Sequence, residues 1–395
     1  MVDFQTIAAV VFLIILTLFV YFNRKNLDTK QLIPYFLYFS MYKTTWGLKL
    51  MDLVAKKYRK FMIYIGYAGI FVGFLGMILI SYGLISNIYV LFTKPEASPG
   101  VGLVLPFKAK GIFFVPFFYW IISIFVIAVV HEFSHGLIAR AHNLKVKSSG
   151  FAFLGLIVPI IPAAFVEPDE KELGKRSHKE QLSVFAAGPF SNIAIAFLFL
   201  AIASFILAPI ANALIEPNGV KVTDYVREKE PFPAETAGIQ IGEIIQQIDD
   251  KPVPYVANLS TALRSKRPND ITTIKTDKSS YKIKLAKNPE NESLAYLGAY
   301  LEQSTKIKDN AKANYGEFLP KALIWVYGLF VILVVLNFGI GLFNLVPIGP
   351  LDGGRMLQLV LHRIFNKEKG NKVWYYIGMF FLILIFFNIV AGFVR

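Results

Sequence analysis

Six long segments without a charged residue constrain the fold of this chain more than any other feature. They cover residues 4–23, 61–93, 111–130, 181–215, 322–351 and 373–394. About 20 mostly apolar residues in succession are enough to cross the hydrocarbon core of a bilayer as a helix. We therefore expect a polytopic α-helical protein that lies in the lipid bilayer and crosses it with about six spans.

The composition limits which partners and which metal ligands the chain can have. Apolar residues make up 55% of the chain and charged residues only 17%, which a soluble domain of this size would not tolerate. Without cysteine, any metal must be held by His, Asp or Glu. The net charge of +14 could suggest nucleic acid, but the solvated segment 216–321 carries 16 basic and 15 acidic residues. The excess belongs to the membrane part, and we expect no nucleic-acid partner.

The first uncharged run, 4–23, could be a signal peptide by its position. However, Asp3 precedes it, no basic residue does, and no small-residue cleavage site follows it. We expect an uncleaved membrane helix.

The basic residues of the loops predict the orientation. Segments 24–60, 136–180 and 353–372 hold nine, seven and five Lys and Arg residues, whereas 94–110 holds three. Loops rich in Lys and Arg stay in the cytoplasm. We therefore expect these three segments to be cytoplasmic, with both termini and segment 216–321 outside the cell.

The N-terminal part, 1–110, is expected to combine spans with an amphipathic cytoplasmic segment. Aromatic residues alternate with lysines there, namely Tyr35, Phe36, Phe39 and Trp46. This pattern predicts an amphipathic helix within 31–60 that lies on the membrane surface.

Segment 219–287 differs in character from the rest of the chain. Short β-rich stretches such as 219–223 and 281–285 are separated by turn residues, which predicts a small inserted α+β domain. Residues 233–253 resemble the turn, helix and strand run of a PDZ domain. Such domains bind extended chain ends by adding a strand to an exposed edge. The alternative is a spacer domain without a ligand.

The motif HEFSH at 131–135 follows directly on an uncharged run. Its i, i+4 spacing places both imidazoles on one face of a helix, where they can share a tetrahedral zinc ion. Glu132 can then take a proton from a zinc-bound water and deliver it to a leaving amine. A chance string is the alternative, but ionisable groups at the end of a span are costly unless they are paired or coordinated.

Two imidazoles leave a catalytic zinc one protein ligand short. Asp352 is the only acidic residue between Glu317 and Glu368, and it follows an uncharged run. The prolines and glycines of 347–354 cannot continue a regular helix, and unwound backbone at membrane depth is tolerated where it lines a wet cavity. We predict Asp352 as the third ligand. It could also cap the helix that follows, which does not exclude ligation.

These features together resemble the site-2 protease family of intramembrane zinc metalloproteases. The match consists of HExxH in one span, an Asn-x-x-Pro run that closes on Leu-Asp-Gly in a later span, and a PDZ domain inserted between them. The run extends here from Asn344 through Pro347 to Asp352 and Gly353. The resemblance covers residues 111–360.

The resemblance implies a domain layout. A catalytic membrane core is expected in two parts, 111–215 and 320–372, with the PDZ-like domain 219–287 between them. A C-terminal span, 373–395, follows.

The resemblance also implies the roles of five residues. His131, His135 and Asp352 would bind Zn²⁺, and Glu132 would be the general base. Asn344 matches the position thought to place the scissile backbone or to stabilise the oxyanion. The family more often has alanine where this chain has Gly136, so we expect that glycine to weaken the helix slightly.

Several further positions gain an interpretation. Residues 148–166 resemble the family's membrane re-entrant β-loop, whose edge could clamp an unwound substrate; alone, they would be an apolar loop or a short span. Residues 187–192 also resemble the family, and Asn192 could bond across helices or serve only in packing. The remaining histidines, which lie among cytoplasmic basic residues, are expected to be solvated: His142, His178 and His362.

The expected function is hydrolysis of peptide bonds within or near the transmembrane segment of single-span membrane proteins, as in regulated intramembrane proteolysis. We expect a multi-pass protein of the cell membrane, with the active site toward the cytoplasm and the PDZ-like domain outside. A transporter or metal-handling protein is the main alternative, but its polar residues should form a path across the bilayer rather than gather at one depth. A silent scaffold that displays the PDZ-like domain is disfavoured by the intact Glu132.

Overall fold

The computed structural model describes residues 4–33, 37–94, 97–107, 109–155, 159–226, 231–289 and 291–394. The chain forms two compact units, each considered by itself. The membrane unit comprises Met1–Ala203 and Gly328–Arg395, and the inserted unit comprises Ser204–Tyr327.

Six helices in the described part of the chain are long and apolar enough to cross a membrane. They are α1 (Phe4–Phe22), α3 (Arg59–Thr93), α4 (Phe117–Ala141), the continuous segment His178–Leu214, α11 (Phe318–Phe343) and α13 (Lys367–Val394). The segment His178–Leu214 consists of α6 (His178–Ile202), a π-helical turn η1 (Ala203–Leu207) and α7 (Ala208–Leu214). The prediction of a polytopic α-helical membrane protein with six spans is confirmed.

Helix α3 packs closely on its neighbours through glycines. A Cβ on Gly66 would lie 3.1 Å from the Cβ of Ser183 on α6, and one on Gly73 would lie 2.8 Å from the Cε of Met356. Small residues of this kind let helix backbones approach each other in a membrane, where dispersion contacts rather than water exclusion hold helices together.

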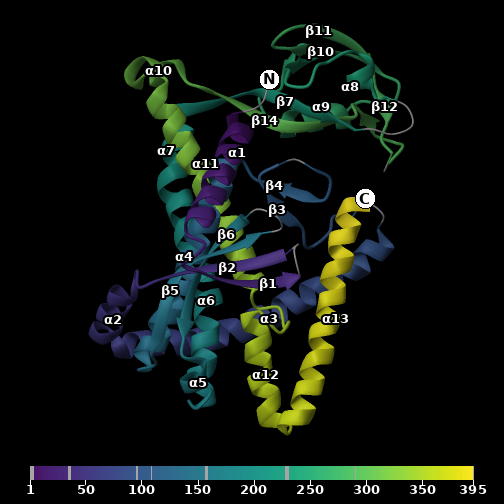
Figure 1. The fold of residues 1–395 in the computed structure, drawn as a ribbon. Coiled ribbons are helices and arrows are strands. Elements are labelled where there is room, and N and C mark those ends of the chain that lie inside the picture. Colours follow the sequence, from purple (N-terminus) through teal and green to yellow (C-terminus); the bar gives the residue numbers. More distant parts are fainter. Residues whose placement is uncertain are drawn as a thin grey trace. The chain divides into compact units, whose positions relative to one another are not determined.

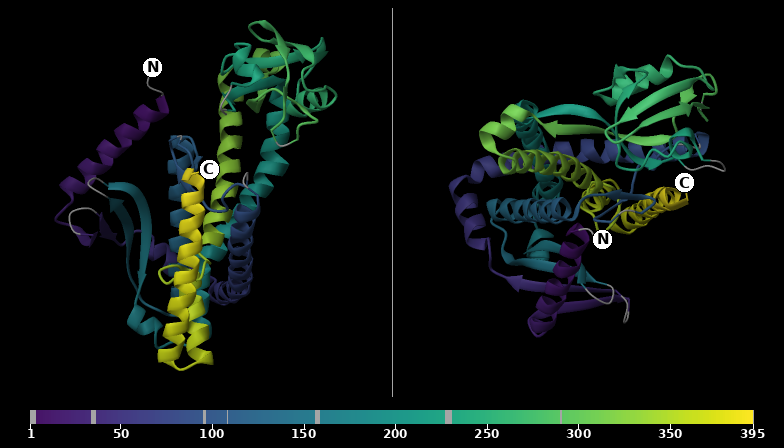
Figure 2. Two further views of the ribbon diagram at one scale, coloured as in Figure 1. Left: turned by 90° about the vertical axis from the view of Figure 1, so that its right-hand side faces the viewer. Right: turned by 90° about the horizontal axis from the view of Figure 1, so that it is seen from above.

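A four-stranded antiparallel sheet completes the membrane unit, in the order β1-β2-β5-β6. Its strands are β1 (Leu27–Ile33), β2 (Leu37–Thr44), β5 (Val146–Gly155) and β6 (Pro159–Pro168). The predicted re-entrant loop 148–166 falls within the β5–β6 hairpin, apart from residues 156–158, which lie outside the described part. Strand β6 is an edge strand and packs on α4. Figure 2 shows this curved sheet beside the helices of the unit.

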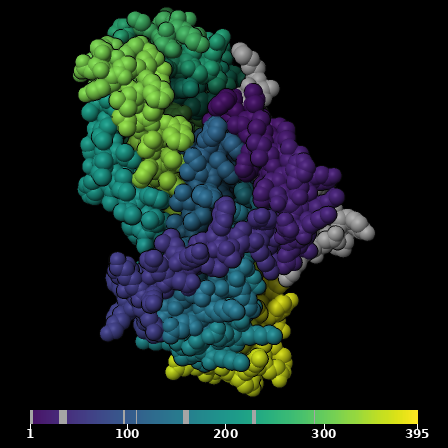
Figure 3. Space-filling view, turned by 60° about the vertical axis from the view of Figure 1, so that its left-hand side comes forward, coloured from purple at the N-terminus to yellow at the C-terminus, as the bar shows by residue number. Residues whose placement is uncertain are grey.

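The amphipathic helix predicted within 31–60 is shorter than expected. Phe39 lies in β2 and Trp46 precedes the helix α2 (Leu48–Lys57), while Arg59 and Lys60 already belong to α3. Tyr35 and Phe36 lie outside the described residues. Aromatic residues that alternate with polar ones also suit a strand, and here pairing with β5 decides for the sheet. Figure 3 shows the face of the unit that carries these N-terminal elements in purple and violet.

Short elements connect the spans. Strands β3 (Leu103–Leu105) and β4 (Ile112–Phe114) pair in parallel before α4, and the single turn α5 (Glu170–Leu173) precedes α6. Helix α12 (Asp352–Ile364) follows α11 after a non-helical stretch and packs against α13 as an antiparallel hairpin (Figure 1). The indole N–H of Trp374 donates to the carbonyl of Gly354 at 2.8 Å and ties the two helices together.

The inserted unit contains a small α+β domain, as predicted. Its sheet has the order β11-β10-β8-β7-β14, with β9 paired to β8. The main elements are β7 (Ile215–Tyr225), α8 (Pro233–Thr236), β8 (Ile244–Ile248), β9 (Lys251–Pro252), α9 (Val256–Arg264), β10 (Ile271–Thr276), β11 (Ser280–Lys284) and β14 (Ala299–Ile307). Two smaller strands, β12 (Ala286–Lys287) and β13 (Ala295–Tyr296), pair with each other, and α10 (Asp309–Tyr315) leads into α11. The core consists of fully buried aliphatic side chains such as Val222, Ile245 and Leu259.

The chain enters and leaves this domain at neighbouring points. Ile215 of β7 pairs with Ile307 of β14, and the backbone N–H of Lys308 donates to the carbonyl of Leu214 at 2.9 Å. Because β14 pairs along β7, the sheet includes residues beyond 287. A short connector between 214 and 308 could therefore replace the whole sheet.

Candidate metal centre

Three side chains converge in the membrane unit. His131 and His135 lie one turn apart on α4, and Asp352 is the first residue of α12. The Oδ2 atom of Asp352 lies 3.1 Å from Nε2 of His131 and 3.4 Å from Nε2 of His135, and the two Nε2 atoms are 3.1 Å apart. Ligand atoms around a tetrahedral zinc with bonds of about 2.0 Å lie about 3.3 Å from one another. The spacing and the donor set, two imidazole nitrogens and a carboxylate oxygen, fit such an ion.

The three side chains are largely but not fully enclosed. The two imidazoles are each 12% exposed and the Asp352 side chain is 14% exposed. Such partial exposure leaves room for a fourth ligand, as a catalytic rather than a structural metal site requires.

Helix α6 packs against the two imidazoles. The Nδ1–H of His135 donates to the backbone carbonyl of Val184 at 2.7 Å, which leaves the Nε2 lone pair of His135 directed at Asp352. One turn later, a Cβ on Gly188 would lie 2.6 Å from Nε2 of His131. Only glycine at 188 lets α6 approach α4 this closely. The contact of Val184 is made by its backbone carbonyl, which the sequence gave no means to identify.

Glu132 points toward the edge of the sheet. Its Oε2 accepts a hydrogen bond from the backbone N–H of Val166 in β6 at 2.9 Å. A strand-edge amide carries no sequence signature, so Val166 could not be identified in advance. Nearby, a Cβ on Gly136 would lie 2.6 Å from Sδ of Met51 and 3.0 Å from Cγ1 of Val166. The glycine at 136 therefore gives α2 and β6 room to pack on α4.

Close backbone contacts stabilise the loop before Asp352. Asn344 follows the end of α11, and its carbonyl accepts a hydrogen bond from the N–H of Gly353 at 2.9 Å. A Cβ on Gly353 would lie 2.7 Å from Cα of Leu345, so no side chain fits there. The helix cap of α12 is Leu351 rather than Asp352, whose carboxylate faces the imidazoles instead. The structure thus brings Asn344 to this loop through its backbone, and a role for its side chain stays a prediction.

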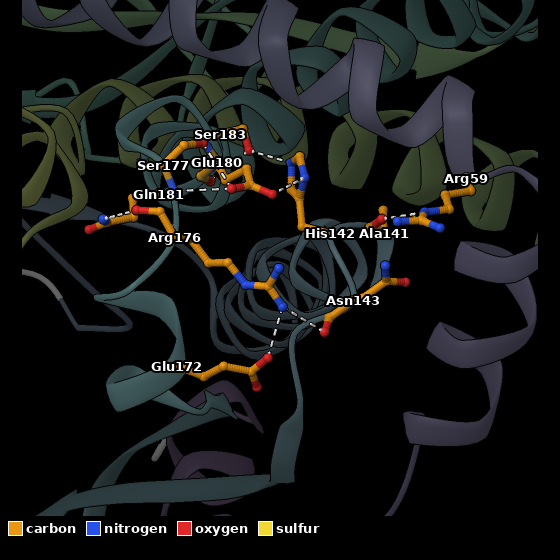
Figure 4. A network of polar contacts seen from close by, with 10 residues as sticks. All are labelled: Arg59, Ala141, His142, Asn143, Glu172, Arg176, Ser177, Glu180, Gln181 and Ser183. Atoms are coloured by element: carbon orange, nitrogen blue, oxygen red, sulfur yellow. Dashed lines mark hydrogen bonds and ion pairs between the residues drawn. The ribbon is translucent and has the colours of Figure 1, made fainter.

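The prediction that His142 is solvated is wrong. Its side chain is only 4% exposed, its Nε2 lies 2.8 Å from Oγ of Ser183, and its Nδ1 lies 3.6 Å from Oε1 of Glu180 (Figure 4). The basic residues near His142 in the sequence indicated solvent, whereas the start of α6, far along the chain, covers it. Of the other two, His178 is exposed as predicted. His362 is half-buried, and its Nε2 forms a hydrogen bond with Oδ1 of Asn371 at 2.7 Å.

An apolar cavity of about 350 Å³ lies beside the Glu132 face of α4. It is lined by α1, α4 and the β5–β6 hairpin, through Phe12, Phe125, Ala128, Phe151 and Ala164 among others. Ala128 lies one helical turn before Glu132, and Ala164 lies two residues before Val166 on β6. The cavity lining thus reaches to one helical turn from Glu132 and to two residues from Val166.

One family model and several known proteins match this chain. The family model for Peptidase family M50 matches residues 119–385. An uncharacterized protein of Methanocaldococcus jannaschii is 27% identical over 259 residues, which is 65% of this chain and 60% of that protein. The regulator of sigma-W protease RasP of Bacillus subtilis is 24% identical over 263 residues, 56% of this chain and 60% of RasP. The chain thus spans 60% of the length of each of these relatives.

Among solved structures, the PDZ domain of the SdrC-like protein from Listeria monocytogenes is 22% identical. The match covers 21% of this chain and 87% of the PDZ-domain chain, with a TM-score of 0.18.

Proposed function

Since this chain belongs to Peptidase family M50, we propose that it is a zinc-dependent endopeptidase of the site-2 type. It would hydrolyse peptide bonds within or near the transmembrane segments of other membrane proteins. The observation that carries the proposal is the convergence of Nε2 of His131, Nε2 of His135 and Oδ2 of Asp352 on a helix that also carries Glu132. With six apolar helices and this family match, the chain is a multi-pass membrane protein.

The proposed chemistry divides between the ion and the chain. When bound by His131, His135 and Asp352, Zn²⁺ would activate a water molecule and polarise the substrate carbonyl. The Glu132 carboxylate takes a proton at Oε and returns it to the nitrogen of the leaving amine, so no covalent intermediate is needed. Asn344 is proposed to place the scissile backbone or to stabilise the oxyanion, as the family pattern implies.

Strand β6 is proposed as the guide for the substrate. A transmembrane helix must unwind before a peptide carbonyl can reach the metal, and its freed backbone groups then need partners in a dry environment. An edge strand supplies such partners by β-addition. The contact between Val166 N–H and Glu132 supports this position, because it joins the edge of β6 to the proposed base. The adjoining apolar cavity would accept substrate side chains.

The proposed topology follows the loop charges. The cytoplasmic ends of the spans would carry the metal centre, and the inserted domain would lie outside the cell. The substrate would be a single-span membrane protein that has already been shortened on its outer side. Its cytoplasmic fragment would then be released, as in regulated intramembrane proteolysis.

The test is cleavage of a panel of tagged single-span proteins by the detergent-purified chain, with the cut mapped by mass spectrometry. We expect cuts within or next to the apolar segment. A zinc chelator should stop the reaction, and added Zn²⁺ should restore it. Cleavage confined to the soluble parts of the substrates, or cleavage that survives the chelator, would overturn the proposal.

The PDZ-like domain, which the sequence predicts at 219–287, is proposed to act as a size filter on substrate ectodomains. Steric exclusion needs no specific groove, and the near balance of charge in 216–321 gives no compositional sign of an electrostatic surface for recruitment. Because β14 pairs with β7, a clean deletion must remove residues 215–307 and join the ends with a short flexible linker.

The deletion protein should cleave full-length substrates that the parent refuses. If the domain instead recruits substrates by a new chain end, the deletion should slow cleavage of shortened substrates. The same deletion with Glu132→Gln is the matched control for contaminating proteases. An unchanged preference for shortened substrates would contradict both versions.

A further inference from the structure

The amide of Asn192 is buried against one of the two imidazoles. Asn192 lies on α6 and is 0% exposed, and its Nδ2 lies 3.2 Å from Nδ1 of His131. Within the described part of the chain, its Oδ1 has no hydrogen-bond partner. Buried amide oxygens are nearly always paired in folded proteins, so this one calls for an explanation.

The chemistry of imidazole supplies the explanation. A ring nitrogen that binds a metal must offer its lone pair, and the proton of the neutral ring then sits on the other nitrogen. His131 directs Nε2 at Asp352, so a metal at that point requires a proton on Nδ1. An N–H at Nδ1 needs an acceptor, yet the amide NH₂ of Asn192 is itself a donor.

Rotation of the amide by half a turn resolves both problems. The oxygen and nitrogen of an asparagine amide have nearly the same shape, and their assignment follows from the hydrogen-bond network. With the amide rotated, Oδ1 of Asn192 accepts from Nδ1–H of His131. The orphaned oxygen then gains a donor, and the Nε2 lone pair of His131 is free for the metal.

The neighbouring imidazole is arranged in the same way. Val184, Gly188 and Asn192 follow each other at intervals of four residues and so share one face of α6. The Val184 carbonyl accepts from Nδ1 of His135, Gly188 leaves space for both rings, and Asn192 meets Nδ1 of His131. One stripe of α6 thus contacts both rings, at the Nδ1 atoms through Val184 and Asn192 and beside the Nε2 atoms at Gly188.

We propose that Asn192 is a positioning residue that holds His131 in its Nδ1–H tautomer through Oδ1, so that Nε2 faces the metal. The inference rests on the proposed zinc site. It assigns α6 a part in metal affinity beyond helix packing.

Two substitutions of similar size separate this role from packing. We measure Zn²⁺ affinity by chelator competition on the detergent-solubilised full chain. Asn192→Leu lacks the acceptor and should weaken zinc binding about 10- to 100-fold. Asn192→Asp keeps an acceptor for Nδ1–H and should bind zinc more tightly than Asn192→Leu does. A residue that only packs predicts the opposite order, because leucine fills the space and a buried carboxylate disrupts it.

The matched control is Asn337→Leu. Asn337 is also a fully buried span asparagine whose Oδ1 has no partner among the described residues, but its Nδ2 donates to the carbonyl of Leu333 within its own helix. Zinc affinity should stay at the parent value in this variant. Size-exclusion elution and helical circular dichroism of all variants report whether they fold.

A second measurement needs no variant at position 192. Nitrogen-15 NMR of the five labelled histidines in the zinc-loaded parent should show His131 protonated at Nδ1 and metal-bound at Nε2. Protonation at Nε2, or parent-like zinc affinity in Asn192→Leu, would overturn this inference and leave the proposed function intact. If the parent itself binds no zinc, the proposed function fails first.

Discussion

Gly188 on α6 faces His131 on α4 so closely that a Cβ on Gly188 would lie 2.6 Å from Nε2 of the imidazole. No side-chain carbon comes this near to a ring nitrogen without displacing it. The glycine therefore sets how deeply the two imidazoles can sit between α4 and α6. The geometry of the proposed metal centre therefore depends on position 188 having no side chain.

Replacing Gly188 with alanine should therefore disturb the metal centre. In Gly188→Ala, both imidazoles must shift away from α6, and we expect zinc content well below that of the parent. Metal analysis of the purified protein measures this. Gly83→Ala on α3 is the control, because no described atom lies within 4 Å of its added Cβ and alanine favours a helix by up to about 1 kcal/mol. Equal zinc content in the two variants would show that the contact is unimportant.

His135 and Asp352 should prove to be ligands of one ion. His135→Ala and Asp352→Ala each remove one of three donor atoms that lie within 4.8 Å of one another, so each should abolish stoichiometric zinc binding. Metal analysis by mass spectrometry checks both. The exposed His178, changed to alanine, should leave the zinc content unchanged. Loss in only one of the two ligand variants would contradict a shared site.

The spans and the proposed metal ligands could be identified from the sequence because each depends on a local pattern of residues. Six uncharged runs indicate six spans whatever their neighbours are, and the spacing of His131 and His135 fixes both rings on one helical face. Asp352 stood out because it is the only acidic residue at the end of its uncharged run. These inferences needed no knowledge of which helix packs on which.

Features that depend on distant partners could not be predicted. His142 is buried because Ser183 and Glu180, some 40 positions along the chain, pack over it. Residues 37–44 form strand β2 because β5 is available to pair with them. The contacts of Val184 with His135 and of Val166 with Glu132 involve backbone atoms, which every residue type possesses.

The burial of His142 predicts acid sensitivity. Burial lowers the pKa of His142 below its usual 6.5; Glu180 opposes this shift, and Arg176 and Arg59 add to it. Unfolded His142 then binds a proton more readily than the folded side chain, so its contribution to stability is complete above pH 6.5 and is lost as the pH falls through the folded-state pKa.

Thermal unfolding in detergent measures this effect. Between about pH 7.5 and about pH 5.5, the midpoint should fall more for the parent than for His142→Gln, which keeps a polar group but does not titrate. A parent whose pH dependence matches that of the variant would show that His142 does not contribute.

The inserted domain should depend on its own core. Ile245 is 0% exposed at the centre of the sheet, so Ile245→Ala should destabilise the domain by about 2–5 kcal/mol. Limited proteolysis should then cut faster within 215–307. Ile271→Ala on β10 is the matched control, because that side chain is 60% exposed and should have little effect. Equal rates of proteolysis would place Ile245 outside the stabilising core.

The most direct test of the account is Glu132→Gln, with zinc content and cleavage measured on the same preparation. Glutamine keeps the shape of the side chain and cannot take a proton, so the metal should stay bound to His131, His135 and Asp352. Cleavage of a single-span membrane substrate should fall by at least about 100-fold relative to the parent, because general acid–base catalysis contributes about 10²- to 10⁴-fold. Parent-like cleavage by the zinc-loaded variant would contradict the proposed role of Glu132 and with it the proposed reaction.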